Sequence, residues 1–376
     1  MKRELLLHTF ILLFFSSFLV SCDLLQSDKN PTKELTAEEA KVEIRAANQE
    51  MAAQVDQMIA TPAMGSLNHL ANLSMDMKSA KVSKSALFVS KLTYSSALNH
   101  FRDAGKPYKS LKMDDDDDEY YGIFEFNFDY DEMEMVQESS TIFQVNYPAD
   151  EVAYANRQNN AQMTISNLDF QEVKSYYEDY DYYTESWIEV ETTDLLPVSA
   201  NVIIKIDGKT ELDASYNASY TADGLPLSVS ASMETAEYKM TMSYSGSSTK
   251  YNTKMSYKLD KEEIMAYDLD VTYSSNQEDV EHIKGYYLFA PLKINGEMYP
   301  AAIETHTENN NPPDLTYLNS QMDIDMIHLE KKAIIGHLEF FMYYDAEWEE
   351  SSPMPAIVYE DGTYEWLTDV MTFIEF

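Results

Sequence analysis

The sequence predicts an α+β protein that is mainly β, in which a long antiparallel meander forms a curved open sheet covered by N-terminal helices. Three observations predict this class. After Tyr120, apolar and polar residues alternate over many consecutive segments, which is the period of a strand with one buried face. Short turn sequences separate these segments. Near the N-terminus, apolar residues recur at three- and four-residue steps, as in an amphipathic helix.

The clearest alternation runs from Val202 to Tyr273, where six consecutive segments each have one apolar and one polar face. Asp207-Gly208, Asp223-Gly224 and Gly246 fall between segments, and such residues suit tight turns. Strands of about ten residues would span about 33 Å, which is long for a globular sheet. The pattern therefore predicts an antiparallel meander of long strands.

Further strands are predicted on both sides of this meander. An Asn295-Gly296 pair indicates a hairpin turn between two apolar segments. The segments concerned are a strand over Phe124–Tyr130, the two hairpin arms Tyr287–Ile294 and Glu297–Ile303, a loop over Asn309–Pro313, and strands with some helix over Lys332–Tyr344 and Thr363–Phe376.

Thr36 and Glu39 have the spacing of a capping box at the start of a helix. In this motif the side chain of each residue accepts a hydrogen bond from the backbone N–H of the other. An apolar stripe follows, and Thr61-Pro62 ends the pattern. A second helical stretch is predicted between residues 82 and 101. The stripe consists of Ala40, Ile44, Ala47, Met51, Val55 and Met58. We therefore expect residues 36–112 to be a helical segment that packs on the sheet, and residues 120–376 to be an antiparallel β domain.

The first 21 residues are predicted to be a secretory signal peptide. Lys2 and Arg3 form a basic start, Leu5–Val20 is largely apolar, and the small residue Ser21 follows. Spanning a membrane takes about 20 apolar residues. This run is shorter and contains hydroxyl side chains, so the sequence favours a signal peptide over a transmembrane helix.

Leu19-Val20-Ser21-Cys22 resembles the lipobox of bacterial lipoproteins. The resemblance implies cleavage after Ser21, a diacylglycerol on the Cys22 thiol, and attachment to a membrane through that lipid. Cys22 is the one cysteine in the sequence. The mature chain therefore has no disulfide bond, and packing alone must stabilise it. Residues 22–35 are polar and are predicted to be a lipidated tether.

Three strand-and-turn phrases are similar to uncharacterised envelope lipoproteins of the Bacteroidota. The phrases are Phe143–Pro148, Asn159–Ile165 and Ala218–Pro226. The resemblance implies an outer-membrane location and carries no activity with it. It leaves open whether the chain faces the periplasm or the cell surface. A long curved sheet on a lipidated chain also resembles the lipoprotein-carrier fold, which cradles lipid.

The charge of the chain excludes one class of partner. Its formal net charge is −38, from 27 basic and 65 acidic residues. Nucleic-acid binding needs a basic surface that displaces counterions from phosphates, so no nucleic-acid partner is expected. Anionic headgroups would also repel this surface, and the lipid on Cys22 is therefore expected to be the membrane anchor.

No catalytic motif is recognisable, and we predict neither an enzyme nor a cofactor. The histidines lack the helical spacing of metal ligands, and neither H-E-x-x-H nor G-x-S-x-G occurs. Two weak ligand sites remain. Asp114, Asp116 and Asp118 could hold a cation, although a bare aspartate run also suits a solvated loop. An acidic aromatic cluster could bind a sugar or a protein, or could simply pack in a sheet. This cluster includes Tyr177, Tyr180, Tyr183 and Trp187.

These observations favour a membrane-anchored envelope lipoprotein whose β domain binds a hydrophobic, glycan or protein ligand. Two alternatives stay open. A secreted glycan-acting hydrolase would need two carboxylates across a sugar bond, and acids are abundant here. Alternating strands and a terminal Phe376 also occur in outer-membrane β-barrels. The apolar helical stripe needs an apolar surface to cover, which favours the open sheet.

Overall fold

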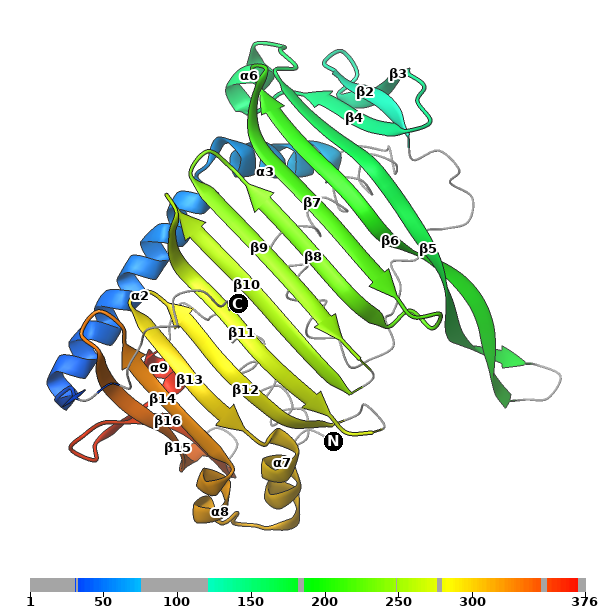
Figure 1. Cartoon of the computed structure of the whole chain (residues 1–376). Helices are drawn as coiled ribbons and strands as arrows, with labels where there is room; N and C mark the ends of the chain where they lie inside the picture. The colour runs from blue at the N-terminus through cyan, green and yellow to red at the C-terminus, as the bar shows by residue number, and fades with distance from the viewer. Residues whose placement is uncertain are drawn as a thin grey trace. The chain divides into compact units, whose positions relative to one another are not determined.

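The structure is a computed structural model of the chain (Figure 1), and it describes residues 31, 33–75, 121–181, 186–247, 249–275, 279–345 and 350–370. The predicted fold class is confirmed, because the chain is mainly β with a long antiparallel open sheet and a few helices. The chain divides into two compact units. The first combines residues up to Asp56 with those from Gly246 onward, and the second contains Gln57–Ser245.

The strands of the second unit pair mostly with their neighbours in the sequence. β4 to β9 form consecutive antiparallel pairs, and β2 pairs antiparallel with β3 and parallel with β4. The elements are α3 (Pro62–Met75), β2 (Gly122–Asn127), β3 (Glu132–Gln137), β4 (Ile142–Tyr147), α6 (Glu151–Ala155), β5 (Ala161–Asp181), β6 (Ser186–Ile206), β7 (Lys209–Tyr220), β8 (Pro226–Glu234) and β9 (Tyr238–Gly246).

The strands of the first unit are also antiparallel from β10 to β17, and the short β1 pairs parallel with β15. Its elements are β1 (Lys33–Glu34), most of α2 (Ala37–Ile59), β10 (Lys250–Leu259), β11 (Glu262–Tyr273), β12 (Val280–Phe289), β13 (Leu292–Met298), α7 (Pro300–Asn309), α8 (Leu315–Ser320), β14 (Met322–His328), β15 (Ala333–Asp345), β16 (Glu350–Val358), β17 (Tyr364–Trp366) and α9 (Leu367–Val370).

The six strands predicted between Val202 and Tyr273 are confirmed as the end of β6 and β7 to β11. Asp207 and Gly208 have φ values of 51° and 78°, the positive angles of the two central residues in a tight hairpin turn. Strand length was underestimated in β5 and β6, which have 21 residues each.

The predicted hairpin at Asn295-Gly296 is wrong. Both residues lie inside β13, and the turn before this strand is at Ala290-Pro291. Position 296 requires glycine, because a Cβ there would lie 2.0 Å from the Asp323 backbone oxygen of β14. The predicted strand Glu297–Ile303 consequently ends at Met298, and α7 begins at Pro300, since proline suits the first helical turn.

The predicted capping box at the start of α2 is confirmed. The Thr36 backbone N–H donates to the Glu39 carboxylate at 3.1 Å, and the Glu39 N–H donates to the Thr36 hydroxyl at 3.4 Å. The predicted stripe is buried at Ala40, Ile44, Ala47 and Met51. The side chains of Val55 and Met58 lie outside the described part of the structure, as does the predicted helical stretch 82–101.

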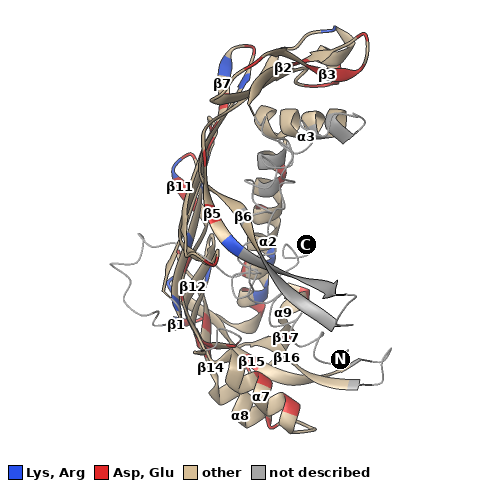
Figure 2. Cartoon of the chain, turned by 90° about the vertical axis from the view of Figure 1, so that its right-hand side faces the viewer, with Lys and Arg blue, Asp and Glu red and all other residues tan. Residues whose placement is uncertain are grey.

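In the first unit, α2 and α9 lie on one side of the strands (Figure 2), and polar contacts attach α2 to the sheet. The His328 imidazole of β14 lies 2.9 Å from the Glu43 carboxylate, which also accepts a hydrogen bond from the Lys331 ammonium. In the second unit, the Ser66 hydroxyl of α3 and the buried Tyr147 hydroxyl of β4 share a 2.9 Å hydrogen bond. None of the helices in the described residues is both long and apolar enough to cross a membrane.

Candidate functional site

An apolar hollow lies on the sheet face of the first unit that also contacts α2. The register of four strands determines which residues surround it. Leu269 of β11, Gly285 of β12, Gly296 of β13 and Ile324 of β14 are direct cross-strand neighbours in one row. The Leu269 and Ile324 side chains point to the same face, because paired residues in a sheet share a face. The two middle positions of this row are glycines, so no side chain stands between Leu269 and Ile324.

Backbone packing explains why both positions are glycine. A Cβ at Gly285 would lie 2.0 Å from the Asp268 backbone oxygen, and the φ of Gly285 is 149°, which L side chains rarely adopt. A Cβ at Gly296 would be equally close to the Asp323 oxygen. Glycine inside a strand commonly marks such a close approach of backbones. The hollow therefore lies where β12 closely approaches β11 and β13 closely approaches β14.

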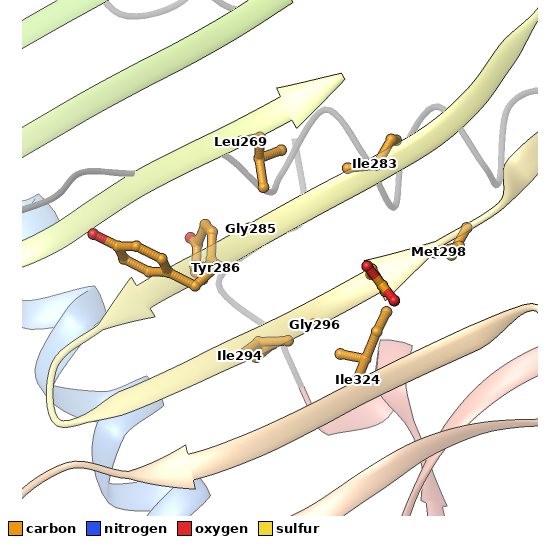
Figure 3. Close-up of a pocket in the computed structure, with 10 residues that line it drawn as sticks. Leu269, Ile283, Gly285, Tyr286, Ile294, Gly296, Met298 and Ile324 are labelled. Carbon is orange, nitrogen blue, oxygen red and sulfur yellow. The ribbon is translucent and has the colours of Figure 1, made fainter. Parts of the chain in front are cut away.

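The lining of the hollow is almost entirely apolar. Figure 3 shows the Leu269 and Ile324 side chains directed toward the two glycines from the flanking strands, with Ile283 and Ile294 beside them. The hollow is shallow: its volume is about 40 Å³, within about 420 Å³ of space that includes the open solvent in front of it. Its ten lining residues are Leu269, Ile283, Gly285, Tyr286, Tyr287, Ile294, Gly296, Glu297, Met298 and Ile324.

Most of the lining side chains are already withdrawn from bulk water. Leu269, Ile283, Ile294 and Met298 are 3–8% exposed, whereas Ile324 is only partly buried. Met298 and Ile324 also contact the hydrophobic cluster that α7 and α8 form with β15. The rim of the hollow is therefore fixed by packing, which favours binding without rearrangement.

The one carboxylate among the ten lining residues is engaged on the other face of the sheet. The Lys284 ammonium lies 3.0 Å from the Glu297 carboxylate, and His282 Nε2 lies 3.4 Å from it but outside hydrogen-bond geometry. The hydrogen bond from Lys284 lowers the pKa of Glu297. Glu297 is therefore an ionised partner of a cation, and the hollow lacks the pair of carboxylates that a glycoside hydrolase requires.

A buried hydroxyl lies at the end of the same row. Thr253 of β10 is the cross-strand neighbour of Leu269 and is 4% exposed. Its hydroxyl has no hydrogen-bond partner within the described part of the chain. An unsatisfied buried hydroxyl is costly. Thr253 is not one of the lining residues of the hollow, so its buried hydroxyl adds no polar group to the lining.

The residues that the sequence singled out do not form this hollow. Cys22, Asp114, Asp116, Asp118 and Tyr183 lie outside the described residues. Tyr177 and Tyr180 are in β5 and Trp187 is in β6, where Tyr180 and Trp187 are cross-strand partners. The side chains of these three residues are not described. Across the described ranges, no group of three or more histidine, cysteine or acidic side chains could hold a metal ion.

The hollow itself was missed by the sequence reasoning. A signal was present, since Gly285 and Gly296 interrupt two alternating apolar segments, and glycine within a strand suggests close backbone approach. The Asn295-Gly296 pair is also typical of a hairpin turn, which is the structure that the sequence predicts there. No protein-family model matches the chain, and no curated protein or solved structure is significantly similar to it.

Proposed function

We propose that this chain is an envelope lipoprotein, anchored in the outer membrane through lipid on Cys22, whose β domain binds an apolar ligand without chemical turnover. The observation that carries the binding proposal is the apolar hollow at the pair of facing glycines, Gly285 and Gly296. The anchoring proposal rests on the Leu19–Cys22 sequence.

The chemistry of the hollow supports an apolar ligand more than a polar one. Its walls are aliphatic side chains from four adjacent strands, and removing apolar surface from water favours association by about 25 cal/mol per Å². The hydrocarbon part of an acyl chain suits these walls, and membrane anchoring would place the protein close to such molecules.

Binding is tested by titrating the purified chain with a dansyl-labelled fatty acid, whose emission increases and shifts to the blue in apolar surroundings. The proposal predicts a saturable signal that an unlabelled fatty acid competes away. A signal that rises linearly without saturation, or that the competitor leaves unchanged, would contradict apolar-ligand binding. Addition of a neutral oligosaccharide serves as a control and should not displace the probe.

Anchoring is tested separately by substituting the lipid-bearing residue. Cells that express the wild-type chain should incorporate radioactive palmitate into it, and Cys22→Ala should abolish this labelling and leave the precursor uncleaved. Normal labelling of Cys22→Ala would remove the lipoprotein proposal without affecting the hollow. Cys22 is the one cysteine, so no other thiol of the chain can substitute for it.

A further inference from the structure

The opposite face of the first unit's sheet has a compact cluster of aromatic rings on β15 and β17. Phe341 and Tyr364 stack with ring centroids 4.2 Å apart and an interplanar angle of 11°. Trp366 makes edge-to-face contacts with Tyr364 at 5.3 Å and with Tyr343 at 5.5 Å. We define these four residues as the aromatic platform.

Register confirms that the platform belongs to one face. Tyr364 pairs with Val358, which pairs with His337, and Phe341 follows His337 by four residues on β15. Successive side chains alternate between faces, so Tyr364 and Phe341 share a face. By the same rule Glu365 lies on the face that contacts α2, where its carboxylate is 3.5 Å from Lys41.

The platform is exposed although its rings are large. Tyr343 is 37% and Tyr364 is 42% exposed, while Phe341 and Trp366 are half-buried beneath and between them. Mutual ring packing restricts the outer rings in advance of binding. Rigid aromatic side chains with a polar hydroxyl supply large contact areas at low entropic cost, so they are favoured in binding surfaces.

Polar groups flank these rings on the same face. The Asp325 carboxylate contacts His337 Nδ1 at 2.5 Å, and His337 belongs to the cross-strand row that ends at Tyr364. Glu339 belongs to the row that ends at Trp366. Flat apolar rings bordered by carboxylate acceptors match a sugar, which presents C–H groups on the faces of its ring and hydroxyl donors at its edge.

We propose that the aromatic platform is a binding site for a neutral glycan. Charge selects this class over acidic polysaccharides, because the flanking carboxylates and the net charge of −38 would repel a polyanion. The site is independent of the apolar hollow, since the two lie on opposite faces of the sheet. Sugar binding by the platform would attach the chain to carbohydrate, in addition to its attachment to the membrane through lipid.

Neighbouring tyrosines on β15 provide a matched pair of variants. Tyr343 is part of the platform, whereas Tyr344 is on the opposite face and is 59% exposed. Tyr343→Ala also removes the edge-to-face contact with Trp366, so its thermal stability is measured beside that of Tyr344→Ala. Tyr343→Phe keeps the ring and removes only the hydroxyl, and therefore separates stacking from hydrogen bonding.

The test is affinity electrophoresis of the full chain, in mild detergent, through native gels containing β-glucan, xyloglucan or galactomannan, with polygalacturonate as the anionic comparison. We expect at least one neutral polysaccharide to retard the wild type and Tyr344→Ala equally. Tyr343→Ala and Tyr364→Ala should weaken binding about tenfold or more, as truncation of a central aromatic contact does. Tyr343→Phe should retain most of the retardation.

Unchanged mobility of the wild type in all neutral gels would overturn the proposal, as would retardation by polygalacturonate alone. Equal losses in Tyr343→Ala and Tyr344→Ala would also overturn it, because these residues lie on different faces. Thermal melting of each variant identifies folding defects. If Tyr364→Ala melts early because Phe341 is uncovered, the comparison of Tyr343 with Tyr344 still decides the question.

Discussion

Two cross-strand rows, one in each unit, differ in whether side chains cover the face of the sheet. In the second unit, Val145, Met163, Ile204 and Leu212 form a row on β4 to β7, and each is at most 3% exposed. In the first unit, the equivalent row contains two glycines between Leu269 and Ile324. Strand pairing is antiparallel in both. The hollow therefore lies where two glycines allow neighbouring strands to approach closely, and local substitutions can test this.

The largest effect is expected at the glycines. Gly296→Ala would force a Cβ to within 2.0 Å of the Asp323 backbone oxygen, so β13 and β14 would have to separate. We expect the free energy of unfolding to fall by about 4 kcal/mol, or the variant to fail to fold. Thermal or urea unfolding measures this. Gly65→Ala is the control: nothing lies within 4 Å of a Cβ at this position in α3, and alanine should stabilise the helix by about 0.5–1 kcal/mol.

Truncation of one isoleucine in each row should lower the free energy of unfolding by different amounts. Ile204→Ala leaves a cavity at a fully buried position and should cost about 3 kcal/mol. Ile324→Ala removes a partly buried side chain that already borders empty space, and it should cost about 1 kcal/mol. Urea unfolding of both variants gives the comparison. Equal costs would mean that the two rows are packed alike.

A smaller effect is expected where α3 attaches to the second unit. Tyr147→Phe leaves the buried Ser66 hydroxyl without its partner and should cost about 1–2 kcal/mol. Burial raises the pKa of Tyr147 to about 12, although the hydrogen bond with Ser66 opposes the shift. A raised pKa means that this contribution is complete below the unfolded-chain value of 10.0 and is lost as pH rises toward about 12.

Unfolding followed between pH 9 and 12 tests this linkage. The difference between wild type and Tyr147→Phe should shrink over the alkaline half of that range. A constant difference would show that the pKa of Tyr147 is the same in the folded and the unfolded chain.

The smallest effect is expected at the attachment of α2 in the first unit. The hydrogen bond from Lys331, followed by that from His328, lowers the pKa of Glu43, while desolvation opposes the shift. Glu43 is partly exposed, so Glu43→Gln should cost only about 0.5–1 kcal/mol at neutral pH. Because the folded-state pKa is lowered, the contribution is present above the unfolded value near 4.5 and is lost as pH falls through the folded value. Acid unfolding curves of the two proteins should therefore converge.

The sequence was informative where one local pattern determines the structure. Period-two alternation predicted β7 to β11, and the spacing of Thr36 and Glu39 predicted the start of α2. It was misleading at Asn295-Gly296, where a strong turn signal was overridden by pairing with two neighbouring strands. The platform joins Phe341 and Tyr343 to Tyr364 and Trp366, and only the register of β15, β16 and β17 brings these together. Such tertiary information is absent from local periodicity.

The central claim is that the gap left by Gly285 and Gly296 binds an apolar ligand, and one matched pair of variants on β14 tests it directly. Ile324→Phe places a larger side chain at the rim of the hollow, whereas Ile327→Phe makes the same change on the opposite face, beside Lys293 and Ile334. The measurement is the dissociation constant of the dansyl-labelled fatty acid for each folded variant. We predict that Ile324→Phe raises it about tenfold or more and that Ile327→Phe leaves it near the wild-type value. Equal affinities for the two variants would contradict the account.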